Sequence, residues 1–286
     1  MNLFLLTALA MAAFAANSVL NRMAVAAGSI DPVSFAMIRL LAGAVMLAIL
    51  IGLRRAVSGR ALWPGWAGRA PAVAGLLVYL FCFSSAYRSL STGTGALILF
   101  GSVQITMFAG ALWSGEAVHR DRWIGAIVAF AGLCLLAAPT LKVTGAAPML
   151  LMASAGAGWG VFSLAGRRSS DALAATAWNF LLALPIALLV WTLLDPAPVT
   201  SVPGVALAVV SGAMTSGLGY ALWYKVLPQL GAARAAVAQL TVPVIAAAGG
   251  FAVIGEGVTL SFTIAAAVVL GGVAIASRQA GSGRVD

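Results

Sequence analysis

Residues 91–134 read STGTGALILFGSVQITMFAGALWSGEAVHRDRWIGAIVAFAGLC. Two long apolar runs flank a short polar stretch that opens with Gly115-Glu116. Each run approaches the roughly 20 apolar residues that an α-helix needs to cross a bilayer. A turn signal and charges between two such runs indicate that the chain leaves the membrane there and returns. The stretch therefore predicts a pair of membrane-spanning helices rather than the core of a water-soluble domain.

The rest of the chain has the same character. Of its 286 residues, 62% are hydrophobic and only 8% are charged, and the mean hydropathy is +1.06. In a soluble domain about a quarter of the residues are charged. The sequence pI of 10.8 does not indicate nucleic acid, because the 16 Lys and Arg are scattered between apolar runs and form no basic face. This composition excludes a soluble enzyme, a disordered protein and a nucleic-acid-binding domain.

The same reading along the whole chain predicts ten spans. They are expected near residues 3–26, 33–53, 70–90, 94–114, 122–139, 147–166, 172–194, 203–226, 231–254 and 259–277. The breaks between them carry turn or charge signals, such as Asp31-Pro32, Pro139 and Pro228. We interpret the first apolar run as a span and not as a cleaved signal peptide, because no basic residue precedes it.

The distribution of Lys and Arg predicts the orientation of these spans. With a cytoplasmic N-terminus and ten spans, twelve of the 16 basic residues fall on the cytoplasmic side. The other four are Arg22, Arg39, Arg88 and Lys142. Because cytoplasmic loops carry an excess of Lys and Arg, both termini are expected in the cytoplasm.

Residues 91–134 have a counterpart 140 residues later. An ungapped shift places Gly115-Glu116 on Gly255-Glu256, and a slightly different shift places Phe14 on Trp159. Since each half then holds five spans, the second copy must enter the membrane upside down. The predicted fold is an all-α integral membrane protein with two inverted five-helix repeats, residues 1–140 and 141–286. Inverted repeats are a recurrent architecture of secondary transporters, although duplication also occurs in membrane proteins that transport nothing.

Several of these motifs resemble a known family. The stretch from Pro32 to Arg39, the two Gly-Glu hairpins and Trp123-Ile124-Gly125 are similar to the EamA-type transporters of the drug/metabolite transporter superfamily. The resemblance covers essentially the whole chain. The second half departs from the pattern, because Ser261-Phe262-Thr263 stands where Trp-Ile-Gly is expected.

That resemblance implies a carrier in the lipid bilayer that works as a monomer on a small-molecule substrate. Within the superfamily the chain looks most like the bacterial YddG-type exporters. This implies export of aromatic and other neutral amino acids across the bacterial inner membrane by alternating access. The alternative is another small metabolite or a drug-like solute on the same fold.

Polar and aromatic side chains inside the spans are the candidates for substrate binding. The amides can bind an amino acid backbone or bond to a neighbouring helix. The aromatic rings can line an apolar pocket or belong to a belt at the membrane interface. We expect the substrate site to contain Asn17, Tyr79, Phe83, Gln104, Trp159, Tyr220 and Gln239. The interface belt better explains Trp63, Trp66, Trp113, Trp123, Trp191, Trp223 and Tyr224.

Three further residues in the spans have two interpretations each. Arg39 can bind a substrate carboxylate, or it can be a structural residue bonded to backbone carbonyls, which we favour slightly. Pro243 is expected to kink the ninth span, and Gly101 lies at the corresponding depth of the fourth. We interpret Gly101 and Pro243 as hinges, and the alternative is that the kink only shapes the packing of the helices.

The sequence contains few residues that could act in catalysis. It contains one histidine and two cysteines and has neither an H-E-x-x-H motif nor a phosphate-binding loop. We therefore expect no catalytic residues, no metal and no cofactor. No Asp or Glu lies in the middle of a predicted span, which favours facilitated diffusion over proton coupling. A channel or a scaffold remains a further alternative, and single-channel currents would reveal the former.

Overall fold

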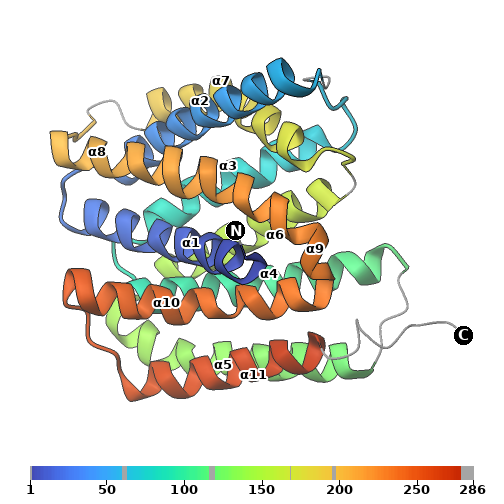
Figure 1. Cartoon of the computed structure of the whole chain (residues 1–286). Coiled ribbons are helices and arrows are strands. Elements are labelled where there is room, and N and C mark those ends of the chain that lie inside the picture. Colours follow the sequence, from blue (N-terminus) through green and yellow to red (C-terminus); the bar gives the residue numbers. More distant parts are fainter. Residues whose placement is uncertain (1, 60–62, 116–119, 168, 195–197, 278–286) are drawn as a thin grey trace, which may run out of the picture.

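The computed structural model describes residues 2–59, 63–115, 120–167, 169–194 and 198–277, and the regular secondary structure in these ranges is helical throughout. The elements are α1 (Leu3–Ala26), α2 (Pro32–Ser58), α3 (Arg69–Ala86), α4 (Thr92–Trp113), α5 (Arg120–Thr144), α6 (Ala146–Arg167), α7 (Ala172–Leu194), α8 (Val202–Val210), η1 (Ser211–Leu218), α9 (Gly219–Gln239), α10 (Thr241–Gly249), η2 (Gly250–Ile254) and α11 (Leu260–Ser277). The two η segments are π-helical. Figure 1 shows how the helices are arranged. The predicted all-helical class is confirmed.

The helices have the length and composition of membrane spans. Eight helical segments of the described chain are long and apolar enough to cross a membrane. Two shorter apolar segments, Thr241–Ile254 and Leu260–Ala276, follow them. Together these segments agree with the ten predicted passes.

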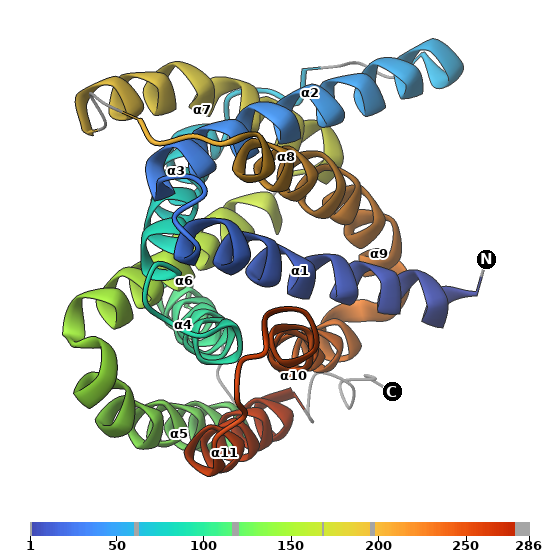
Figure 2. The same cartoon turned by 90° about the vertical axis from the view of Figure 1, so that its left-hand side faces the viewer.

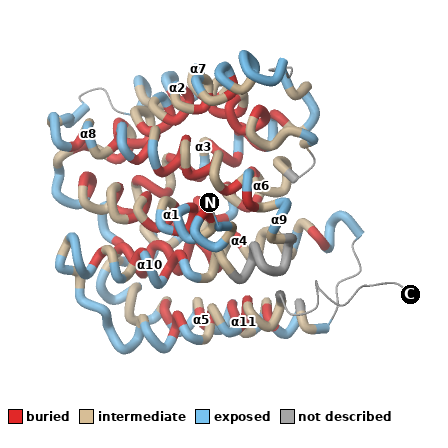
Figure 3. Tube along the Cα trace, in the orientation of Figure 1, coloured by how far each residue is buried: buried red, intermediate tan, exposed pale blue. Residues whose placement is uncertain are grey.

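The helices form pairs at two opposite edges with a bundle between them. Helix α2 packs on α7 at one edge, and α5 packs on α11 at the other. Helices α1, α3, α4, α6, α9 and α10 lie between these pairs (Figure 2). Buried residues concentrate on the inner faces of the bundle (Figure 3). Large apolar side chains such as Ile127, Phe130 and Leu189 are exposed. An apolar outer surface suits a protein whose surroundings are hydrocarbon.

Close contacts between helices depend on small residues. A Cβ atom at Gly158 would lie 2.6 Å from the carbonyl oxygen of Gly75, so α6 approaches the backbone of α3 there. On the neighbouring face of α6, a Cβ at Gly156 would lie 2.6 Å from the carbonyl oxygen of Leu99 in α4. The glycine-rich segment 156–160 thus lets α6 fit between α3 and α4, as expected for small residues at membrane helix interfaces.

Turn residues end the helices close to several predicted breaks. Asp31 caps α2, because its carboxylate accepts a hydrogen bond from the Ser34 amide at 2.7 Å, and Pro32 occupies the first turn. Gly59 ends α2 with a φ of 64°, five residues beyond the predicted end. Gly255 has a φ of 76° and ends η2 in the predicted Gly-Glu hairpin.

Three predicted helix boundaries were wrong. Pro139 lies inside α5, which continues to Thr144, and Pro228 lies inside α9, which continues to Gln239. The ninth pass therefore begins with α10 at Thr241 and not at residue 231. A membrane helix tolerates an internal proline because neighbouring groups can satisfy the freed carbonyl, so proline is a weaker stop signal there than in a soluble helix.

We expect the α3–α6 contact to fail when Gly158 gains a methyl group. Gly158→Ala should lower the stability of the folded protein by about 1–3 kcal/mol, because the new Cβ meets backbone atoms that cannot move aside. Thermal unfolding of the purified protein in detergent measures the change. Gly52→Ala is the matched control, since a Cβ at Gly52 meets nothing within 4 Å. Equal unfolding temperatures for the two variants would contradict the close crossing.

Candidate functional site

Aromatic rings gather around Trp159 in the middle of the bundle. The Trp159 ring centroid lies 5.0 Å from that of Tyr79, 5.1 Å from Tyr220 and 5.3 Å from Phe162. Phe14 completes this ring cluster at 6.4 Å. These rings come from α1, α3, α6 and α9, and Trp159 is half-buried while the others are buried. The cluster gives an apolar centre that four helices build together.

Four of the predicted site residues belong to this region. Tyr79, Trp159 and Tyr220 are members of the ring cluster, and Phe83 lies beside Tyr79 with a centroid distance of 5.2 Å. The four-residue spacing of Tyr79 and Phe83 places both rings on the same face of α3. Trp223, which we assigned to the interface belt, is instead 6% exposed and contacts Phe14 at 5.9 Å.

Arg39 is completely buried next to these rings. Its Nη2 donates a hydrogen bond to the Tyr79 hydroxyl at 2.7 Å, and its Nε donates to Ser216 Oγ at 3.1 Å. The guanidinium carbon lies 5.0 Å from the ring centroid of Tyr79 and 5.1 Å from that of Phe83. Cation–π contacts of this kind contribute more when water is excluded. The partners of Arg39 are therefore side chains and not the backbone carbonyls considered from the sequence.

Asn17 connects α1 to the π-helical segment η1. Its Oδ1 accepts hydrogen bonds from Ser211 Oγ at 2.5 Å and from Thr215 Oγ1 at 2.9 Å. Its Nδ2 donates to Ser216 Oγ at 3.4 Å. Ser216 also accepts from Arg39, which in turn donates to Tyr79. A continuous polar network thus runs from Asn17 through Ser216 and Arg39 to Tyr79.

The hydroxyl residues of this network are the part that sequence reasoning missed. Ser211, Thr215 and Ser216 lie in one stretch of small residues, SGAMTSGL, which forms η1. Gly212 lies so close to α2 that an added Cβ would meet the carbonyl oxygen of Arg39. A concentration of Ser, Thr and Gly inside an apolar span is the signal that could have indicated this site. π-Helical segments are found frequently at functional sites.

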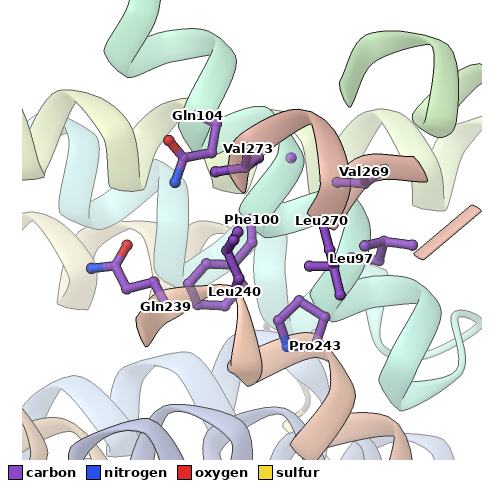
Figure 4. A pocket seen from close by; sticks show the side chains of 10 residues that line it. Leu97, Phe100, Gln104, Gln239, Leu240, Pro243, Val269, Leu270 and Val273 are labelled. Carbon is purple, nitrogen blue, oxygen red and sulfur yellow. The ribbon is translucent and has the colours of Figure 1, made fainter. Parts of the chain in front are cut away.

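The remaining predicted residues line a separate cavity in the bundle. Gln104, Gln239, Gly101 and Pro243 share one small cavity between α4, α9, α10 and α11 (Figure 4). Apolar side chains fill most of its wall, and the space inside it is about that of a single water molecule. Among the described residues, neither glutamine amide has a hydrogen-bond partner. The structure therefore divides the predicted site into the ring cluster with Asn17 and this glutamine cavity.

The expected pair of helix breakers is not seen. Pro243 is the third residue of α10, where a proline needs no hydrogen-bond acceptor, and the interruption itself falls at Leu240. Gly101 lies inside α4, which runs without a break. A Cβ at Gly101 would lie 2.8 Å from the methyl groups of Leu133, so this glycine serves the packing of α4 on α5.

An ion pair closes the bundle at the end where α1 stops. Arg22 Nε donates to Glu256 Oε1 at 2.8 Å, and Arg22 Nη1 donates to the carbonyl oxygens of Tyr87 and Arg88. Glu256 Oε2 accepts a hydrogen bond from the Thr92 amide at 2.7 Å. The contacts of Arg22 and Glu256 join α1, the α3–α4 turn and the η2–α11 loop.

Within the described residues, no group of three or more His, Cys, Asp or Glu side chains could hold a metal ion. His119 and Glu116 lie outside the described residues.

Comparisons with known proteins indicate the family. A model of the EamA-like transporter family matches residues 2–138 and again residues 144–278. An uncharacterized protein of Pseudomonas aeruginosa is 44% identical over 271 residues, which make up 95% of this chain and 93% of that protein. A protein of known crystal structure is 20% identical, with a TM-score of 0.68 over 96% of this chain and 98% of that structure. This last likeness concerns the fold alone.

We expect Asn17→Ala to weaken the attachment of α1 to η1. Loss of the Asn17 carbonyl leaves the buried Ser211 hydroxyl without its acceptor, which costs about 1–3 kcal/mol. Thermal unfolding in detergent measures this loss. Thr7→Ala on the same helix is the control, because the Thr7 hydroxyl bonds only to the Leu3 carbonyl one turn away. A loss no larger for Asn17→Ala than for Thr7→Ala would mean that the network does not hold the helices together.

Proposed function

Because the chain belongs to the EamA-like transporter family, we propose that it is a secondary carrier that exports amino acids, aromatic and other neutral ones, across the bacterial inner membrane. The observation that carries the cargo assignment is the ring cluster around Trp159 with Arg39 beside it. An apolar pocket with few polar groups is the usual form of a site for a small amphiphile. The rings suit the side chain of the cargo, and the polar network suits its charged end.

The pattern of helix contacts supports two inverted repeats, residues 1–140 and 141–286. In this scheme α1 corresponds to α6, and α3 corresponds to the continuous run of α8, η1 and α9. The contact of α3 with α6 then corresponds to the contact of α1 with α9, and both are present. The pairs α2–α7, α4–α10 and α5–α11 each map onto themselves. The family model also matches each half of the chain separately.

Alternating access in this scheme means that the halves rock about the ring cluster. The Arg22–Glu256 ion pair closes one end, which the Lys and Arg distribution assigns to the non-cytoplasmic side. Both termini then lie in the cytoplasm. Opening toward the outside requires this ion pair and the hydrogen bond from Thr92 to break together. We propose that the helix interruption from Leu240 to Pro243 is the hinge. A single copy of the chain contains the ring cluster, the ion pair and the hinge.

The driving force that we propose is the gradient of the cargo itself. Asp31, Asp171 and Glu256 lie at helix ends or in loops, so none of them forms a proton relay through the middle of the bundle. Net flux should therefore follow the cargo gradient and persist after an uncoupler collapses the proton gradient. Loss of flux on uncoupling, with cargo binding intact, would contradict this mechanism.

Uptake of labelled tryptophan and phenylalanine into liposomes that contain the purified protein tests the cargo. We expect saturable uptake that Trp159→Ala weakens roughly tenfold or more, because a ring contact and its buried area are lost. Trp113→Ala is the matched control, since Trp113 is 95% exposed and should leave uptake unchanged. No uptake of any amino acid by the folded protein would leave the alternative cargo, another small metabolite or a drug-like solute.

Locking the Arg22–Glu256 end tests alternating access. Cysteines at positions 22 and 256, in a chain with Cys82 and Cys134 replaced by Ser, can be joined by a cleavable bis-methanethiosulfonate reagent. We expect the cross-link to stop flux and a reducing agent to restore it. Each single cysteine treated in the same way is the control. Full flux through the cross-linked protein would show that this end need not open.

A further inference from the structure

Arg39 is a buried cation for which the described part of the chain provides no anion. Its side chain is 0% exposed, and its Nη1 has no hydrogen-bond partner. The ion pairs among the described residues are Arg22–Glu256 and Arg54–Asp171. Asp31, on the turn that precedes α2, lies eight residues and therefore about 12 Å of helix from Arg39.

The partners that Arg39 does have are neutral. They are the hydroxyls of Tyr79 and Ser216 and the ring faces of Tyr79 and Phe83. Arg69, the other buried arginine, also has one nitrogen without a partner, its Nε, but it lies at the first residue of α3, at the end of a span, where the Ala175 carbonyl and the Asn179 amide oxygen accept its hydrogen bonds. A desolvated guanidinium deep in a span is costly unless an anion compensates it. The unused Nη1 and the missing counter-charge both point to an anion that comes from outside the protein.

We propose that Arg39 binds the carboxylate of the cargo and that the carried class is aromatic monocarboxylates, with the α-amino group dispensable. This proposal rests on the proposed function and names the chemistry of the same site. Tyr79 connects the two halves of the recognition, because its hydroxyl accepts from Arg39 while its ring lies 5.0 Å from that of Trp159. A carboxylate on Arg39 therefore places an aromatic group a few bonds away among the rings.

The amino end of an amino acid has no comparable partner. None of the described carboxylates lies in the ring cluster or in the polar network from Asn17 to Tyr79. A protonated amine brought to this place would instead meet the positive charge of Arg39. Aryl carboxylates without an amine should therefore be carried, whereas the matching amines and neutral amides should not.

The test compares 3-phenylpropionate, phenylalanine, 3-phenylpropanamide and phenethylamine as labelled cargo in liposomes and as ligands in thermal unfolding. We expect the wild-type protein to carry and be stabilised by the two carboxylates only. Arg39→Gln should weaken the binding of 3-phenylpropionate roughly tenfold to a hundredfold, as expected for the loss of a charged hydrogen bond. Arg39→Lys should weaken this binding less. Arg55→Gln is the matched control, because Arg55 is exposed at the far end of α2.

The outcomes separate this proposal from the proposed function. If folded wild-type protein carries phenylalanine but folded Arg39→Gln keeps the wild-type affinity for 3-phenylpropionate, this proposal is overturned and the carrier remains. Uptake of the amide or the amine by the wild type, or equal stabilisation by chloride, would overturn it as well. If Arg39→Gln does not fold, Arg39→Lys replaces it. A ratio of carboxylate affinity to amide affinity equal to that of the wild type would then overturn the proposal. No uptake of phenylalanine or of any of the other three compounds would instead refute the proposed function.

Discussion

Hydrocarbon offers no hydrogen bonds, so each polar group inside this bundle must find its partner within the protein. The arrangement of the inner helices follows from this constraint. Asn17, the hydroxyls of η1 and Arg39 satisfy one another across α1, α2 and the π-helical segment, and this network fixes how the three elements meet. The one nitrogen that the network leaves without a partner, Nη1 of Arg39, is consequently the position with most to gain from a ligand.

Small residues set the distances within which such a network can form. Gly158 and Gly156 bring α6 against α3 and α4, and Gly212 brings η1 against the backbone at Arg39. Large rings then fill the space that the crossing helices leave between them, with Trp159 at its centre. Close backbone contact and a wide aromatic centre are therefore two results of one distribution of glycines.

Much of the fold could be predicted from the sequence, because apolar runs of membrane length and turn residues such as Asp31 and Gly255 are local signals. The face that each helix turns toward the inside of the bundle could not be predicted. A span that is apolar all round gives no period from which an inner face can be read. Tyr79 and Trp159 lie in the aromatic centre as expected, but Trp223, which the sequence placed in the interface belt, is buried against Phe14 as well. The break at Leu240 and the π-helical η1 depend on tertiary packing, so Pro228 alone predicted the wrong helix end and Pro243 the wrong position for the interruption.

The ring cluster also affects what else can cross this membrane. An ion gradient across a membrane stores energy, and a continuous file of water through a membrane protein would let protons leak down that gradient. Phe14, Tyr79, Phe162 and Tyr220 crowd around Trp159, and the nearby glutamine cavity has space for about one water. Rings packed in this way leave little room for a continuous file of water through the centre of the bundle. Electrical insulation of the empty carrier thus comes from the same side chains that would receive its cargo.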